Sequence, residues 1–350
     1  MPQRRSEQVL TERRQRVLAA AIRHHISTAE PVSSEALVAA APLGVSSATV
    51  RNEMASLASM GYLDQPHTSA GRVPTDSGYR FYVNRLLRHL PRPTPREQRI
   101  VQEKLVTQRA VEPALETSCR VLATVTRCPS VASSPRLSAS RVRHLQLTSV
   151  NHRHLLLVLA VSTGEVRHSL LLVDRPPSAS QLRPLNRLLN ERFGGTRLED
   201  LTEQALVAST RTLPAWDERL ATILRFIADS ARGGTTGRLH LRAVLQHSPE
   251  GLEATALADL LTILGDEALL LRLISRPRAG RVSVIIGSES EHPAMRNCAV
   301  VAAPYWLEST PAGAVGIVGP KRMHYERALA MVGFTARALG ESLSRLGMGA

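Results

Sequence analysis

The side chains with the clearest capacity for specific chemistry lie on one face of a helix predicted from Ser46 to Met60. Ser46 is placed as the N-cap, because its hydroxyl can accept a hydrogen bond from a backbone N–H of the first turn. Gly61 follows the last turn, where a left-handed residue can close the helix and bring Tyr62 against Leu57 in a Schellman motif. Three apolar residues at helical spacing predict the buried face: Val50, Met54 and Leu57.

The outward side of this helix is small and polar, which suits contact with base edges in duplex DNA. Its candidate DNA-contacting residues are Ser46, Ser47, Ala48, Thr49, Arg51, Asn52 and Ser56. Short side chains let a helix lie close to the bases in the major groove, while Asn and Arg can form bidentate hydrogen bonds to adenine and guanine. The unpaired N–H groups at the helix N-terminus can also bind a phosphate. The alternative is an ordinary amphipathic helix whose polar face contacts only water.

A short polar turn follows this helix and supports the first interpretation. Residues 62–74 predict a small hairpin whose turn is formed by residues 67–71. Thr68, Ser69 and Arg72 suit contacts with phosphates or with the minor groove. Helix, turn, helix and hairpin, in that order, predict a winged helix-turn-helix.

The segment that carries these elements is strongly basic. The chain of 350 residues has a formal net charge of +14, and residues 1–99 contain 14 Arg and no Lys against 8 Asp and Glu. This balance favours a polyanionic partner, either nucleic acid or an anionic membrane surface. The longest apolar run, Leu155–Val161, is far too short to span a bilayer, and the first residues lack the apolar core of a signal peptide. We therefore expect a cytoplasmic protein that does not enter the membrane.

The rest of the chain divides by composition. Residues 91–97 contain three prolines and predict a helix-excluding linker. Alternating apolar residues predict strands from about 142 to 174, and helical periodicity covers about 178–275. Strands return at about 281–319, before a last helix at about 323–346. We expect one mixed α/β sheet that is interrupted by a helical insertion.

No arrangement of residues predicts catalysis, a cofactor or a metal site. The run Gly313–Gly319 lacks the Lys-Ser/Thr pair of a P-loop and the spacing of a dinucleotide-binding loop. His24, His25 and the tract Asn151–His154 lack cysteine or carboxylate partners at metal-ligand spacing. The three cysteines form no CxxC pair, which favours buried free thiols in a reducing compartment. We expect a protein that is not an enzyme.

Two N-terminal stretches closely resemble the bacterial heat-inducible transcription repressor HrcA family: LTERRQRVLAAAIRHHISTAEPVSSEAL and GVSSATVRNEMASLASMGYLDQPHTSAGRVPTDSGYRFYV. The resemblance extends to IIGSE, NCAVVAAPY and GIVGPKRMHYERA near the C-terminus. It implies an α+β multidomain fold: a winged-helix DNA-binding domain at 1–90, a linker at 91–97, a GAF-like domain at 98–177 and 276–350, and an inserted, mainly helical dimerisation domain at 178–275. One departure is Ala29, which stands where the family usually has Gly.

The resemblance also implies a function. Family members are negative regulators of heat-shock (chaperone) operons, which bind an inverted-repeat operator in double-stranded DNA as a homodimer and are released on heat stress. A GroEL-type chaperonin is implied as the partner that maintains the active form. Since each chain carries a single helix-turn-helix, a two-fold pair is needed to read both half-sites.

The homodimer contact is expected within the helical insertion. The candidate surface is an apolar stripe formed by Leu220, Ile223, Leu224 and Ile227. The alternative is that these residues cover the core of their own domain.

Besides the chaperonin-dependent repressor, two other functions stay open: a repressor gated by a small molecule and a nonspecific nucleic-acid-binding protein. In a winged-helix repressor gated by a small molecule in the GAF-like domain, the ligand would stabilise the protein and release DNA. In the chaperonin-dependent repressor, chaperonin alone would raise operator binding. A nonspecific nucleoid or RNA-binding protein is a further alternative, and excess random DNA would displace it from the operator.

Overall fold

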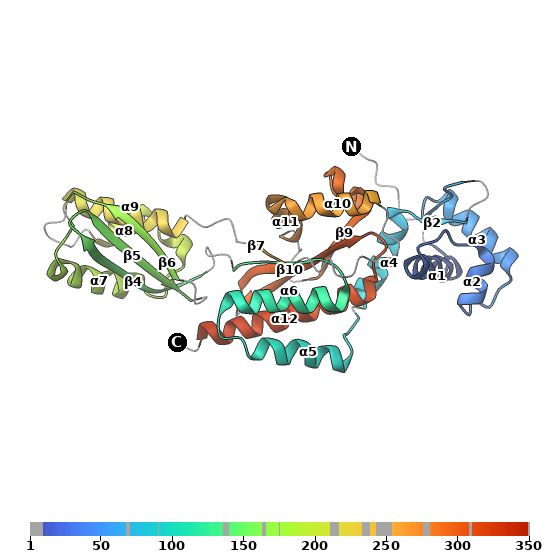
Figure 1. Ribbon diagram of the computed structural model, residues 1–350, viewed down its shortest axis with the longest axis horizontal. Helices are drawn as coiled ribbons and strands as arrows, with labels where there is room; N and C mark the ends of the chain where they lie inside the picture. The colour runs from blue at the N-terminus through green and yellow to red at the C-terminus, as the bar shows by residue number, and fades with distance from the viewer. Residues whose placement is uncertain are drawn as a thin grey trace.

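The computed structural model describes most of the chain between Leu10 and Met348. The described residues are 10–67, 71–89, 91–135, 140–162, 166–174, 176–210, 217–232, 239–242, 254–275, 281–307 and 310–348. Figure 1 shows an elongated molecule in three parts. An N-terminal helical unit lies at one end, a sheet with helices on both faces lies in the centre, and a smaller sheet with its own helices lies at the other end.

The N-terminal unit combines four helices with one antiparallel hairpin. Its elements are α1 (Glu12–Thr28), α2 (Ser34–Ala40), α3 (Ser47–Ser59), β1 (Leu63–Asp64), β2 (Val73–Pro74) and α4 (Asp76–Arg88). The apolar residues of α1 that recur at helical spacing, from Val17 to Ile26, are buried. α1 ends at Ala29, which has a left-handed φ of 65°. This conformation costs an L-residue roughly 1–2 kcal/mol, so α1 closes on a strained residue.

A five-stranded antiparallel sheet forms the centre of the molecule, with the strand order β7-β3-β10-β9-β8. The strands are β3 (Ser130–Ser133), β7 (Leu239–Arg242), β8 (Ser283–Ile286), β9 (Cys298–Leu307) and β10 (Thr310–Pro320). The short turns η3 (Gly287–Glu289) and η4 (Pro293–Asn297) lie between β8 and β9.

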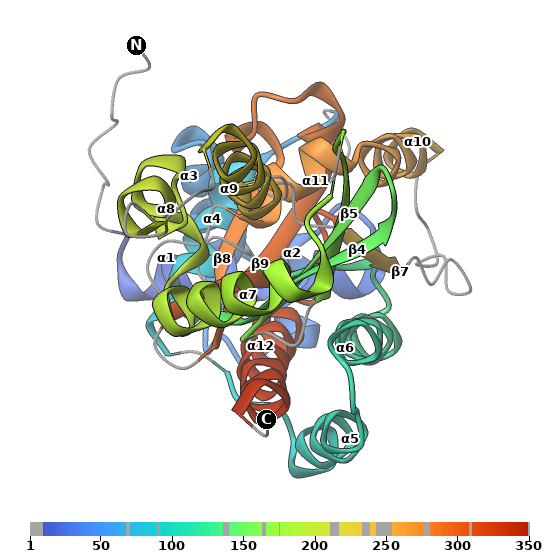
Figure 2. The same cartoon turned by 90° about the vertical axis from the view of Figure 1, so that its left-hand side faces the viewer.

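Helices cover both faces of this sheet (Figure 2). On one face lie α6 (Val111–Thr126) and α12 (Tyr325–Met348), with α5 (Pro95–Val106) packed outside them. On the other face lie α10 (Ala254–Gly265) and α11 (Glu267–Ile274). In β9, Val301 packs in the core on the α12 side, while Val300 packs in the core beneath α10 and α11. Since neighbouring residues of a strand face opposite ways, a strand covered on both sides needs a continuous apolar run.

Residues 140–232 fold into a separate unit. β4 (Val142–Asn151), β5 (His154–Val161) and β6 (Val166–Leu172) form an antiparallel sheet in that order. One face of the sheet shares a core with η2 (Leu198–Asp200), α7 (Ala179–Phe193), α8 (Glu203–Thr210) and α9 (Asp217–Arg232). We call this segment the β4–β6 unit.

Two asparagines of α7 occupy the outer edge of β4. The side-chain amide of Asn190 bonds the N–H and the carbonyl of Leu145 at 2.9 and 2.6 Å. The amide of Asn186 bonds the N–H and the carbonyl of Leu147 at 2.8 and 2.9 Å. These backbone groups would otherwise be open to another strand.

The expectation of one sheet running from residue 142 to 319 is wrong. β4, β5 and β6 form their own sheet, because its apolar face is covered by the helices that follow directly in the chain. The central sheet instead includes β3 and β7, two strands that the sequence analysis does not predict. α10 and α11, expected inside the insertion, pack on the central sheet.

The apolar stripe expected to form the dimer contact covers its own core. Ile223, Leu224 and Ile227 are buried against the β4–β6 sheet, and the side chain of Leu220 lies outside the described residues. Periodicity identifies a buried helix face, but it does not identify the element that covers it. The alternative considered for this stripe is therefore the correct one.

Candidate nucleic-acid interface

α3 has the two caps that its sequence predicts. The Ser46 hydroxyl accepts a hydrogen bond from the Thr49 N–H at 3.3 Å. Gly61 has a φ of 81°, and its N–H bonds the Ala58 carbonyl at 2.9 Å. The Tyr62 N–H bonds the Leu57 carbonyl at 2.9 Å, which completes the Schellman motif. Both ends of the predicted helix are therefore confirmed.

The predicted inward and outward faces of α3 also match the structure. Val50, Met54 and Leu57 are buried. On the outward side, the exposed candidates are Ser46, Ala48, Arg51 and Asn52, and the half-buried ones are Ser47, Thr49 and Ser56. The structure thus brings seven of the predicted residues together on one surface.

A buried carboxylate, which no local pattern in the sequence predicts, fixes the rear of α3 to α1. Glu53 accepts hydrogen bonds from Nε of Arg13 at 2.7 Å and from Nε of Arg14 at 2.9 Å. The Arg14 hydrogen bond is the largest of the effects that hold the pKa of Glu53 below its ordinary value, and it outweighs burial. Two arginines that contribute to the basic composition therefore serve to hold the helix.

Arg51 is paired in the structure, which its sequence position does not reveal. Its guanidinium donates to the Glu35 carboxylate of α2 at 2.8 Å, and the Ser47 hydroxyl donates to the same oxygen at 3.1 Å. The Glu35 backbone N–H, the Ser34 and Ser47 hydroxyls and Arg51 together lower the pKa of Glu35 to about 2. A carboxylate thus lies among the candidate DNA-contacting residues, and its Oε1 accepts hydrogen bonds from Ser34, Ser47 and Arg51.

The hairpin is held to the segment between α1 and α2. Arg72 and Val32 exchange two backbone hydrogen bonds of 2.9 Å. The backbone approach is close, because a Cβ on Gly71 would lie 2.6 Å from the Val32 carbonyl oxygen. Arg72 itself is half-buried, with its Nε buried and without a hydrogen-bond partner among the described residues. Thr68 and Ser69 lie outside the described residues.

Other chemistries find little support in the described part of the chain. Its His, Cys, Asp and Glu residues form no group of three that could hold a metal ion. Cys119, Cys128 and Cys298 are buried and form no disulfide, and burial raises the pKa of Cys128 and of Cys298 to about 12. Within the same part, no helix combines the length and apolarity needed to cross a membrane.

Known proteins match this chain along nearly its whole length. A family model described as "HrcA protein C terminal domain" matches residues 112–329. A relative from Parafrankia sp. (strain EAN1pec) is 36% identical over 337 residues, covering 96% of this chain and 99% of the relative. A relative from Moorella thermoacetica is 34% identical, covering 96% of this chain and 99% of the relative. A relative from Pelotomaculum thermopropionicum is 32% identical, covering 96% of this chain and 98% of the relative. All three carry the name heat-inducible transcription repressor HrcA.

This chain belongs to the HrcA family. Membership confirms the expected negative regulation of heat-inducible transcription, since the family is one of transcription repressors and not of enzymes. A solved structure described as a hypothetical protein shares the fold of this HrcA chain, with a TM-score of 0.63 and 23% identity. That match covers 96% of this chain and 99% of the other.

Proposed function

We propose that this HrcA protein represses heat-shock (chaperone) operons by binding an inverted-repeat operator as a homodimer. α1–α4 and the β1–β2 hairpin act as a winged helix-turn-helix, with α3 in the major groove. The observation that carries this proposal is the outward face of α3, where Ala48, Arg51 and Asn52 are exposed on a helix capped at both ends.

Three exposed side chains of α3 suit the reading of base edges. Ala48 allows close approach to the bases and offers a methyl group to thymine. Asn52 makes no hydrogen bond within the described part of the chain, so its amide is available to an adenine. Arg51 can exchange Glu35 for guanine at small cost, because the ion pair is exposed, and exposed pairs contribute little to stability.

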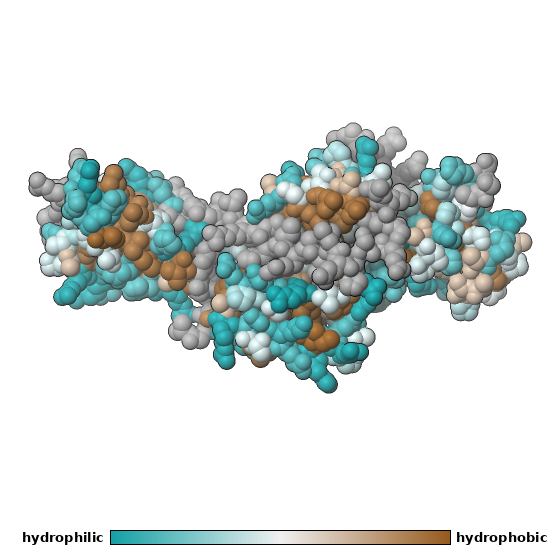
Figure 3. Space-filling model, in the orientation of Figure 1, coloured by the Kyte–Doolittle hydropathy of each residue, from teal (hydrophilic) through white to brown (hydrophobic). Residues whose placement is uncertain are grey.

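Dimerisation is proposed through the open face of the β4–β6 sheet, opposite α7–α9. Val166, Leu170 and Leu172 of β6 are 59%, 56% and 61% exposed. Leu156 of β5 lies directly opposite Leu170 and is half-buried. Figure 3 shows apolar side chains gathered on the surface of this unit. The exposed His168 separates Val166 from Leu170 on this face, so the apolar cluster centres on Leu156, Leu170 and Leu172. Exposed apolar clusters are typical of protein–protein interfaces.

The contacts of each segment support a revised domain division. We propose a DNA-binding domain over residues 10–89 and a GAF-like domain that combines residues 91–135 with 239–348. The inserted dimerisation domain then covers residues 140–232, because β4–β6 and α7–α9 share one core. Helices on both faces of the central sheet support the GAF-like assignment.

A GroEL-type chaperonin is proposed as a second partner, on the strength of family membership. The decisive experiment is a gel shift of the full-length protein on an inverted-repeat operator, with and without chaperonin. A scrambled half-site and excess random DNA serve as competitors. We expect retention on the intact repeat alone, increased by chaperonin. Equal retention on both DNAs would mean that the protein binds nucleic acid nonspecifically.

A further inference from the structure

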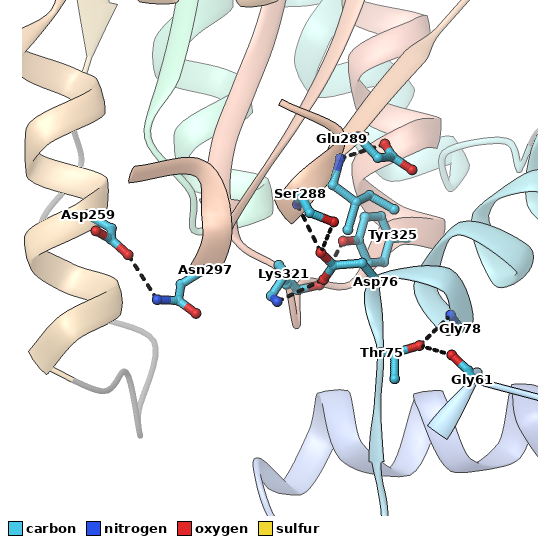
Figure 4. A network of polar contacts seen from close by, with 11 residues as sticks. Gly61, Thr75, Asp76, Gly78, Asp259, Ser288, Glu289, Asn297, Lys321 and Tyr325 are labelled. Carbon is cyan, nitrogen blue, oxygen red and sulfur yellow. Dashed lines mark hydrogen bonds and ion pairs between the residues drawn. The ribbon is translucent and has the colours of Figure 1, made fainter. Parts of the chain in front are cut away.

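Two adjacent residues, Thr75 and Asp76, connect α3 to the central sheet (Figure 4). They stand at the start of α4, directly after the hairpin, and their side chains have partners on opposite sides. Thr75 bonds groups of the N-terminal unit, whereas Asp76 bonds groups that belong to the central unit.

Thr75 fixes the end of α3 to the beginning of α4. Its hydroxyl donates to the Gly61 carbonyl at 2.7 Å and accepts from the Gly78 N–H at 3.1 Å. Its backbone N–H bonds the Tyr62 carbonyl at 3.2 Å. Gly78 lies so close to the same carbonyl that a Cβ there would collide with it. These contacts therefore hold the end of α3 against the beginning of α4.

Asp76 fixes the beginning of α4 to the central unit. Its carboxylate accepts hydrogen bonds from the Ser288 N–H at 2.9 Å, the Ser288 hydroxyl at 2.8 Å and Lys321 Nζ at 2.8 Å. Gly287 has a left-handed φ of 49°, and a Cβ at this residue would collide with the carboxylate. The turn after β8 is therefore shaped to receive this one side chain.

The charge on Asp76 persists at neutral pH. Burial alone would raise the pKa of this carboxyl, but the hydrogen bonds from Lys321 and Ser288 outweigh it and hold the pKa below its ordinary value. A depressed carboxyl pKa means that the contribution to stability is present above the ordinary Asp range and is lost as the pH falls below it. The contact is thus constant under physiological conditions.

Further along α4, more side chains reach the central unit. Arg80 forms an ion pair with Glu289 and donates to the Val284 carbonyl at 2.7 Å. The Tyr82 hydroxyl donates to Glu326 of α12 at 2.7 Å. We name the group Asp76, Arg80, Ser288, Glu289 and Lys321 the α4 clamp. Its members come from three of the stretches that resemble the HrcA family: VPTDSGYRFYV, IIGSE and GIVGPKRMHYERA.

We propose that the α4 clamp sets the spacing between half-sites that the dimer accepts, with Asp76 and Arg80 as positioning residues. The inference rests on the proposed function. A dimer reads two half-sites a fixed distance apart, and each added base pair turns one half-site by about 35° about the DNA axis. A recognition helix on a flexible tether could follow that turn. A satisfied polar network is directional, so it holds α3 at one angle to the sheet.

The first test measures spacing selectivity. Full-length protein is titrated with operators whose half-sites are intact and whose spacer is changed in single base-pair steps. We expect a sharp optimum for the unaltered protein. For Asp76→Asn and Arg80→Gln, we expect the affinity ratio between the best and the neighbouring spacings to fall about tenfold. Discrimination against a single changed base within a half-site, at the best spacing, should stay the same, because α3 is intact.

Two further variants separate the clamp from general damage. Gly287→Ala disturbs the clamp from the side of the central unit without changing any charge. Like Asp76→Asn, it should reduce the dependence of operator affinity on spacer length. Asp259→Asn is the matched control. It removes a carboxylate that accepts a hydrogen bond from the Asn297 amide at 2.9 Å, within the central unit. This variant should keep the sharp optimum in spacer length. A sharp optimum in both Asp76→Asn and Gly287→Ala would overturn the proposal.

A second test does not depend on DNA. Spin labels are placed at two exposed positions, Ser59→Cys on α3 and Glu341→Cys on α12, and the distance distribution between them is measured in the free protein. We expect a narrow distribution that broadens in Asp76→Asn and Gly287→Ala and stays narrow in Asp259→Asn. If it stays narrow in all variants, the clamp does not hold the orientation. If the distribution broadens in the clamp variants but the gel shift shows no binding of the protein to an inverted repeat, the proposed operator is wrong and the orienting role of the clamp is supported.

Discussion

The two ends of the molecule expose opposite kinds of surface. At one end, α3 presents Arg51 and Asn52, side chains that water solvates well when no partner is bound. At the other end, β6 presents Val166, Leu170 and Leu172 on a single sheet face. An apolar face gains about 25 cal/mol for each Å² removed from water, whereas a polar face gains little from burial alone. Under the proposed function, this contrast predicts reversible binding at α3 and lasting association at β6.

The largest expected effect comes from a charge on the apolar end. Leu170→Asp should dissociate the dimer, because a carboxylate in an apolar interface loses its hydration without gaining a partner. We expect a monomer in sedimentation velocity and an operator affinity lowered by about 100-fold or more, since a single module loses the second half-site. Val106→Asp is the control, because Val106 is also an exposed valine, at 55%, but lies on α5. If the Leu170→Asp protein stays dimeric, the apolar face of β6 is not the dimer interface, and the proposed difference between the two ends is wrong.

The next effect lies at the polar end. Asn52→Ala should weaken operator binding by about 1–3 kcal/mol, the usual contribution of a bidentate contact to a base. Binding to random DNA should change far less, and the dimer should persist. Asn84→Ala is the matched control, because Asn84 is exposed on α4, away from the outward face of α3. An equal loss on operator and random DNA would contradict the assignment of α3 as the recognition helix.

A smaller effect should sharpen the description of the polar end. Glu35→Gln keeps the shape of the side chain but removes a negative charge beside Arg51. We expect binding to random DNA to strengthen by about threefold at low salt and selectivity for the operator to fall. Because the pKa of Glu35 is about 2, its carboxylate stays charged through the ordinary Glu range, and the pair with Arg51 is lost only as the pH falls through about 2. Selectivity of the unaltered protein should therefore be constant between about pH 6 and 8.

The smallest effect should leave both ends unchanged. Ala29→Gly relieves the left-handed φ of 65° at the end of α1, and we expect the free energy of unfolding to rise by up to about 1 kcal/mol. Denaturant unfolding measures the gain, while operator affinity and oligomeric state serve as the controls. A loss of stability would mean that the flexibility glycine adds to the unfolded chain outweighs the strain it removes.

Local signals in the sequence suffice to predict α3, whereas long-range contacts decide the rest. Ser46 and Gly61 act within one turn of the helix, so their roles follow from neighbouring residues. The pairing of β3 with β7 depends on a partner about 100 residues away. The separation of β4–β6 from the central sheet depends on which helices cover the apolar face of these strands, and the alternation within a strand does not specify that. Glu35 and Asp76 are absent from the prediction for the same reason, because their partners lie on other elements.

The asparagines of α7 have a consequence for how far this sheet can be extended. Asn186 and Asn190 satisfy the backbone of β4, and β4 is one of the two borders of its three-stranded sheet. The amides hold the N–H and carbonyl groups of Leu145 and Leu147, which a further strand would need for pairing. This sheet therefore cannot be extended by strand addition at those residues of β4, whatever binds the face that β6 exposes.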